Sequence, residues 1–98
     1  MERLLAVIRS RGPGWDGARG LEEQRDWPSH AAFMNALVAD GFVLVGGPLE
    51  GTSDTLLIVR AVDERQVRAR LSSDPWTRAD LLRVTLVAPW TLRLGSLD

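Results

Sequence analysis

Residues 28–45 read PSHAAFMNALVADGFVLV, a stretch in which a helical pattern passes directly into a strand pattern. The apolar side chains that recur at helical spacing are Phe33, Met34, Leu37 and Val38. Proline in the first turn and glycine just past the last turn are typical helix boundaries, so we expect a helix over 28–40 that ends at Gly41. The apolar run 42–45 then predicts a strand. The fold therefore mixes helices and strands in close alternation.

The sequence on either side of this unit predicts three more strands and one more helix. These elements are strands over 3–10, 55–62 and 81–94, and a helix over 63–71 with Asp63 as N-cap and Gln66 in the capping-box position. Pro89 interrupts the last strand and favours a sheet edge for it. The resulting order, β-α-β-β-α-β, is that of ferredoxin-like α+β folds. Right-handed crossovers then give an antiparallel sheet in the order 4-1-3-2, with both helices on one face.

Composition limits what such a domain can do. The chain of 98 residues suits a single domain over 1–98, and its net charge of −1 excludes a basic field for nucleic acid or an anionic membrane. It has no cysteine, and its twelve basic residues are all arginine, which excludes disulfides, thiolate nucleophiles and lysine Schiff bases. With a single histidine, no metal site and no cofactor are expected. The lack of a signal-peptide pattern or a long apolar run predicts a cytoplasmic protein.

The strands of the predicted sheet are apolar on both faces. In the first strand, Leu4, Ala6 and Ile8 alternate with Leu5 and Val7. Two helices can cover only one face, and an uncovered apolar face is typical of an interface. We therefore expect a homodimer that packs through the helix-free sheet face. The alternative is that loops or tails cover this face.

The predicted topology brings distant segments to one edge of the sheet. The end of the first strand, the start of the first helix, the end of the second strand and the start of the last strand all lie there. His30 and Asp74 would meet at this edge. An imidazole oriented by a carboxylate can serve as a general base near neutral pH, so these two residues are the candidate catalytic pair. The alternative is structural: an inward histidine hydrogen-bonded in the core and an aspartate that shapes an Asp-Pro turn.

The same edge supplies candidate ligand contacts. Trp15 and Trp76 would line a pocket, and the Gly46-Gly47-Pro48 segment, expected as a bend after its strand, would offer backbone amides to an oxyanion. Arg9, with its neighbour Arg11, would hold an anionic ligand. Core packing and exposed strand ends are the corresponding structural alternatives. The expected ligand is a small aromatic or anionic molecule.

The segment Gly12-Pro13-Gly14-Trp15-Asp16-Gly17 matches the spacing G-x-G-x-x-G. A dinucleotide site needs a helix that opens at the last glycine, whereas this chain continues with Arg19-Gly20 and its helix is expected near residue 28. Pro13 also removes an amide donor. We therefore reject a nucleotide-binding function and expect a lid or pocket wall built around Trp15.

Several motifs together resemble the YCII-related family. They are Gly12-Pro13-x-Trp15-Asp16, Trp27-x-x-His30-x-x-Phe33-Met34-x-x-Leu37, Gly41, Gly46-Gly47-Pro48-Leu49, Asp74-Pro75-Trp76 and Pro89-Trp90. The resemblance covers nearly the whole chain and implies a ferredoxin-like fold that assembles as a dimeric α/β barrel. It also implies an active-site pair at His30 and Asp74. The family's Asp-Pro-aromatic motif often carries Phe, where this chain has Trp76.

Three functional hypotheses follow. The leading one is a cofactor-independent small-molecule enzyme of lyase or isomerase type, in which His30 is the general acid/base and Asp74 orients its imidazole. The second is a non-catalytic dimeric module that binds a small ligand in the same pocket. The third is a structural dimerisation domain whose sheet edge is filled by side chains and holds no cavity.

Overall fold

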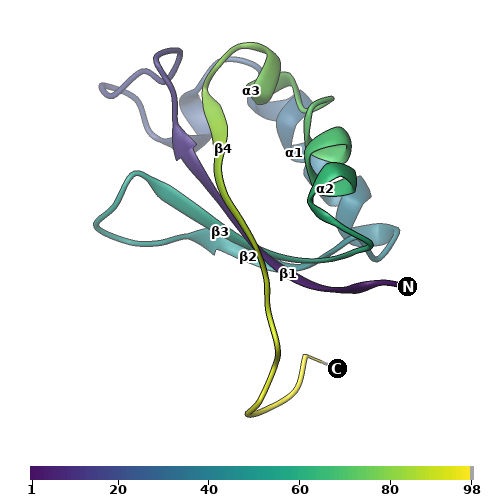
Figure 1. Cartoon of the computed structure of the whole chain (residues 1–98). Coiled ribbons are helices and arrows are strands. Elements are labelled where there is room, and N and C mark those ends of the chain that lie inside the picture. Colours follow the sequence, from purple (N-terminus) through teal and green to yellow (C-terminus); the bar gives the residue numbers. More distant parts are fainter. Residues whose placement is uncertain (98) are drawn as a thin grey trace.

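The computed structural model describes residues 1–97 and shows an antiparallel sheet with helices on one face (Figure 1). The elements are β1 (Arg3–Arg11), a 3-10 turn η1 (Leu21–Glu23), α1 (Trp27–Ala39), β2 (Val43–Pro48), β3 (Asp54–Ala61), α2 (Glu64–Leu71), α3 (Pro75–Arg78) and β4 (Leu82–Pro89). The strand order is β2-β3-β1-β4. This is the predicted order 4-1-3-2 read from the opposite edge, so the ferredoxin-like α+β fold is confirmed.

The C-terminal end of α1 and the N-terminal end of α2 have the capping interactions that their sequences predict. After α1, the amides of Gly41 and Phe42 bond back to the carbonyls of Val38 and Leu37, with Gly41 at φ 84°. This Schellman arrangement requires a left-handed residue, which glycine adopts without a steric penalty. Before α2, the Asp63 side chain accepts a hydrogen bond from the backbone N–H three residues later.

Most element boundaries lie within one residue of expectation, and two strand ends differ by more. Helix α1 starts at Trp27, one residue early, whereas β4 ends at Pro89 rather than at residue 94. The segment Gly46-Gly47-Pro48 is not a bend but the last part of β2, in register with residues 57–55 of β3. Because β2 is an edge strand, Pro48 can occupy it without removing a shared hydrogen bond from the sheet interior.

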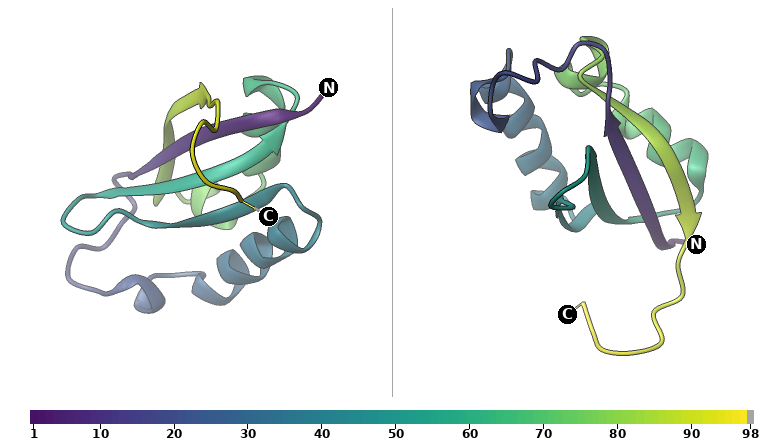
Figure 2. Two further views of the ribbon diagram at one scale, coloured as in Figure 1. Left: turned by 90° about the horizontal axis from the view of Figure 1, so that it is seen from below. Right: turned by 90° about the vertical axis from the view of Figure 1, so that its left-hand side faces the viewer.

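The main core lies between the sheet and the helices. Leu5 and Val7 of β1 and Val59 of β3 face the helices and are buried. On the other face, Val45 and Leu86 remain 49% exposed. The chain after β4 runs beneath this face, opposite the helices (Figure 2), without covering those two side chains. No described helix is long and apolar enough to cross a lipid bilayer.

Candidate active site

The structure joins the first turn of α1 to the start of α3. His30 is buried on the inner face of α1, and its Nδ1 lies 2.9 Å from both carboxylate oxygens of Asp74. This juxtaposition matches the sequence-predicted convergence. Because Nδ1 faces the carboxylate, it carries the ring proton in the neutral imidazole, and Nε2 is left as the acceptor. Among residues 1–97, the one buried side-chain nitrogen or oxygen without a partner is Arg9 Nε, so His30 Nε2 is not sealed in the core.

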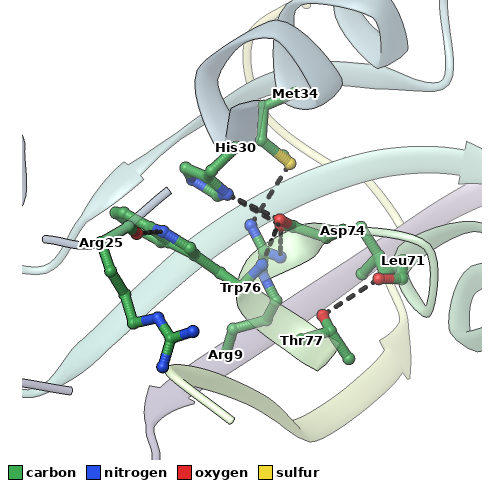
Figure 3. A network of polar contacts seen from close by, with 8 residues as sticks. All are labelled: Arg9, Arg25, His30, Met34, Leu71, Asp74, Trp76 and Thr77. Carbon is green, nitrogen blue, oxygen red and sulfur yellow. Dashed lines mark hydrogen bonds and ion pairs between the residues drawn. The ribbon is translucent and has the colours of Figure 1, made fainter. Parts of the chain in front are cut away.

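Asp74 is the centre of a wider polar network (Figure 3). Its carboxylate is fully buried and caps α3 by accepting a hydrogen bond from the Trp76 amide at 2.9 Å. It also accepts one from the Arg9 Nη1 at 2.8 Å. Burial raises the pKa of Asp74, but the hydrogen bonds from His30, Arg9 and the Trp76 amide together outweigh burial and lower it. Asp74 is therefore a carboxylate at neutral pH and combines the turn-shaping and the histidine-orienting roles.

Arg9, the expected anion-binding residue, does not lie at an exposed strand end, which was the structural alternative for it. Its side chain is 2% exposed, and its Nη2 contacts the Met34 sulfur at 3.4 Å while Nη1 binds Asp74. The guanidinium thus neutralises the carboxylate that orients His30. A register shift between Ile8 and Arg9 accompanies this inward placement. Arg9 and His30 therefore bind the same carboxylate, that of Asp74.

Trp76 holds the histidine ring from one side. The two rings are parallel, 5° apart, with centroids separated by 3.8 Å. Trp76 is itself anchored by its indole N–H, which donates to the Arg25 carbonyl at 2.6 Å. Trp15 and Trp27 pack against Trp76 at centroid distances of 5.5 and 5.7 Å. The stack fixes the orientation of the imidazole, and sequence periodicity contained no signal for it.

The glycine-rich loop is a wall of the site. The amides of Gly12 and Gly14 donate to the carbonyls of Leu81 and Asp80, both at 2.9 Å. A Cβ on Gly14 would lie 2.3 Å from the Ala79 carbonyl oxygen, so this close approach requires glycine. The glycines therefore serve backbone packing that positions Trp15, in agreement with the rejection of a nucleotide-binding loop.

A cavity of about 260 Å³ opens beside His30. Its lining includes all the predicted ligand contacts, namely Arg9, Trp15, Gly47, Pro48 and Trp76. Asp74 does not line it but lies behind the imidazole, on the Nδ1 side. Arg11, Trp27 and Met34 also contribute to the wall. Since a cavity of ~150 Å³ accommodates benzene, this one has room for a single substituted ring. Its presence argues against a sheet edge filled by side chains.

Within residues 1–97, no group of three or more His, Cys, Asp or Glu side chains lies close enough together to hold a metal ion. The groups of the site that can take part in acid–base chemistry are His30 and Asp74, with hydrogen-bond donors around the cavity.

The fold and the site define a small ferredoxin-like α+β protein with a buried His–Asp pair at a ring-sized cavity. Among solved structures, the chain is similar to 5-chloro-2-hydroxyhydroquinone dehydrochlorinase from Burkholderia phenoliruptrix AC1100, in complex with 2,5-dihydroxybenzoquinone. The two share 28% identity with a TM-score of 0.67, over 90% of this chain and 93% of that one. No protein-family model and no curated protein sequence matches the chain. The structural likeness supports the fold and is consistent with a small-molecule enzyme.

Proposed function

We propose that this protein is a cofactor-independent small-molecule enzyme of lyase or isomerase type. The observation that carries the proposal is the hydrogen bond from His30 Nδ1 to Asp74, because it directs Nε2 of a cavity-lining histidine away from the carboxylate. Nε2 is the general base and, once protonated, the general acid. Asp74 is a positioning residue that fixes the tautomer.

The proposed step begins with transfer of a substrate C–H or O–H proton to His30 Nε2, which leaves the electron pair on the substrate. In an isomerase the imidazolium returns this proton to another atom of the substrate. In a lyase the electron pair expels a leaving group as an anion, and the proton passes from the imidazolium to water. Donors at the cavity wall stabilise the developing negative charge. Both routes balance without an oxidant or a reductant.

The proposed substrate class is a planar ring with ionisable oxygen substituents. The cavity volume of about 260 Å³ and the aromatic side chains Trp15, Trp27 and Trp76 suit such a ring. The similar structure is named for a dehydrochlorinase and holds 2,5-dihydroxybenzoquinone. We include membership of the YCII-related family in this proposal, because the motifs around His30 and Asp74 resemble those of that family.

The proposal includes a homodimer that forms through the helix-free sheet face. Val45 and Leu86 are each 49% exposed on that face, although both lie in strands. A second copy of the same face would bury these side chains in the manner of an isologous interface.

A non-catalytic binding module is the second candidate function. The close stacking of Trp76 on His30, at 3.8 Å, is the observation that favours it, because a clamped imidazole also suits a purely structural hydrogen bond. In that case ligands would stabilise the protein but would not be converted.

A thermal-shift screen followed by a product assay separates the two functions. The screen starts with 2,5-dihydroxybenzoquinone and 5-chloro-2-hydroxyhydroquinone and extends to small hydroxylated and acidic rings. Conversion of any stabilising compound by the wild-type protein, and its loss in H30Q, supports the enzyme. Stabilisation without product by any compound of the screen supports the binding module.

A further inference from the structure

Two arginines near the end of β1 line the cavity, and only one of them forms an ion pair within residues 1–97. Arg9 and Arg11 are two residues apart, so they point to the same face of the strand. Arg9 donates to Asp74 at 2.8 Å, so the positive charge of its guanidinium is balanced. Arg11 makes no ion pair with any of residues 1–97. One cation of the cavity wall is therefore not neutralised.

Asp54, the acidic residue among those that line the cavity, forms no ion pair with Arg9 or Arg11. Asp54 accepts a hydrogen bond from the Ser10 hydroxyl at 2.6 Å, and the two residues face each other across β1 and β3. Ser10 alternates with Arg9 and Arg11, so its side chain and the Asp54 carboxylate lie on the opposite, helix-free face. Within the described chain, Arg11 thus has no direct ion-pair partner at the cavity.

The Arg11 guanidinium also has a defined position. Its central carbon lies 4.5 Å from the ring centroid of Trp15. Trp15 in turn packs edge-on against Trp76, which stacks on His30. A cation–π contact of this kind restrains an otherwise flexible side chain. A continuous series of ring contacts, through Trp15 and Trp76, therefore connects the Arg11 guanidinium to the imidazole of His30, the proposed base.

A second donor at the same wall lacks an acceptor. Arg9 Nε is buried and has no hydrogen-bond partner among residues 1–97. A buried N–H of this kind destabilises the protein until an acceptor meets it. Arg9 Nε is thus not open to a ligand in the cavity as the side chains stand, whereas Arg11 is exposed and offers its positive charge to an anionic oxygen.

We propose that Arg11 is the specificity-determining residue of the cavity and that it selects planar ligands carrying an oxyanion, a carboxylate or a phenolate. This inference rests on the proposed function in so far as both place the ligand in one cavity. The anionic group binds at Arg11, and the ring lies along the tryptophan wall toward His30 Nε2. Ligands without the anionic group are bound more weakly.

Calorimetric titration with matched pairs of probes tests this selectivity. Benzoate is compared with benzamide, and 4-nitrophenolate with 4-nitroanisole, on wild type, R11M, R11K and R65M. Arg65 is exposed on α2, makes no ion pair among the described residues and lies outside the cavity, so R65M is the matched loss of one positive charge. Unfolding midpoints of all variants are measured in parallel.

We expect wild type and R65M to prefer at least one anion over its neutral partner by about tenfold, the effect of one charged hydrogen bond. Added salt should weaken this preference. R11M should lose it and R11K should retain part of it. An R11M variant that keeps the preference, or a wild-type protein that shows none for either pair, overturns the proposal. H30Q should lose turnover but keep the preference, so failure of the catalytic proposal is recognised separately.

Discussion

The imidazole of His30 and the indole of Trp76 are parallel to within 5° at a centroid distance of 3.8 Å, while the same imidazole bonds through Nδ1 to Asp74. Stacking and hydrogen bonding together leave one edge of the ring, that of Nε2, free of protein partners in the described chain. The side chain is 9% exposed, and its residue lines the cavity. A histidine held in this way has lost the rotational freedom that would otherwise oppose proton transfer at a fixed position.

Removal of the Arg9 guanidinium tests its role beside Asp74. R9M leaves a buried carboxylate without its arginine partner, so the free energy of unfolding should fall by about 3 kcal/mol. Urea unfolding measures this loss. R65M, which removes an exposed arginine that makes no ion pair within residues 1–97, is the matched control and should change the free energy of unfolding by less than about 0.5 kcal/mol. Equal stability of R9M and wild type would show that the buried Arg9–Asp74 pair does not stabilise the fold.

The glycine loop offers a test with a matched control. G14A places a Cβ 2.3 Å from the Ala79 carbonyl oxygen, whereas a Cβ on Gly17 meets nothing within 4 Å. G14A should lower the free energy of unfolding by about 1–3 kcal/mol and displace Trp15, and G17A should change it by less than about 0.5 kcal/mol. Urea unfolding followed by tryptophan fluorescence measures both effects. Equal stability of the two variants would mean that the loop is not pinned to this turn.

The proposed dimer can be broken without touching the cavity. L86E places a charge on the helix-free sheet face, and V38E places one on a helix surface of similar exposure, 49% against 52%. Burial of the charge in the interface would be strongly unfavourable, so L86E should be a monomer by sedimentation equilibrium, while V38E should remain a dimer. A monomeric wild-type protein, or a dimeric L86E, would exclude this interface.

Acid should destabilise the protein partly through Asp74. Although burial raises the pKa of Asp74, hydrogen bonds from His30, Arg9 and the Trp76 amide lower it below the value of an unfolded chain. The carboxylate therefore stabilises the fold above about pH 4, and this contribution disappears as the pH falls through the lower folded-state value. The melting temperature of wild type should drop more steeply below about pH 4 than that of D74N.

The control for the acid experiment is D40N. The Phe42 amide lowers the pKa of Asp40 as well, but this carboxyl lies at the surface, where solvent screens its interactions. D40N should follow the wild-type acid profile more closely than D74N does. The same steep drop in D74N as in wild type would show that Asp74 is not the source of acid sensitivity.

Much of this site could be predicted from topology. Right-handed β-α-β connections bring the start of α1 to the segment before the last strand, so His30 and Asp74 are expected near each other without any side-chain detail. The sequence also indicated the inward position of Arg9, because the strand alternation that buries Leu5 and Val7 places Arg9 on the same face. Its partner could not be predicted, because that depends on the rotamers of both side chains.

Other features could not be predicted from the sequence, because they depend on contacts that form only in the folded protein. Strand β2 has a register shift between Val43 and Val45 and continues through Pro48. Both features depend on its pairing with β3, whereas a Gly-Gly-Pro segment by itself favours a turn. The stack of Trp76 on His30 depends on the short helix α3, whose four residues contain no periodic pattern. The Schellman end of α1, in contrast, follows from the local sequence around Gly41.

The most direct test of the account compares turnover by wild type, H30Q and H30A on a compound that the wild-type protein converts, with 5-chloro-2-hydroxyhydroquinone assayed first. Glutamine preserves a hydrogen-bonding side chain but cannot exchange a proton near neutral pH. The account predicts a fall in kcat of at least about 100-fold in both variants, with a melting temperature in H30Q within a few degrees of wild type. Undiminished turnover by H30Q would contradict the assignment of His30 as the general acid/base.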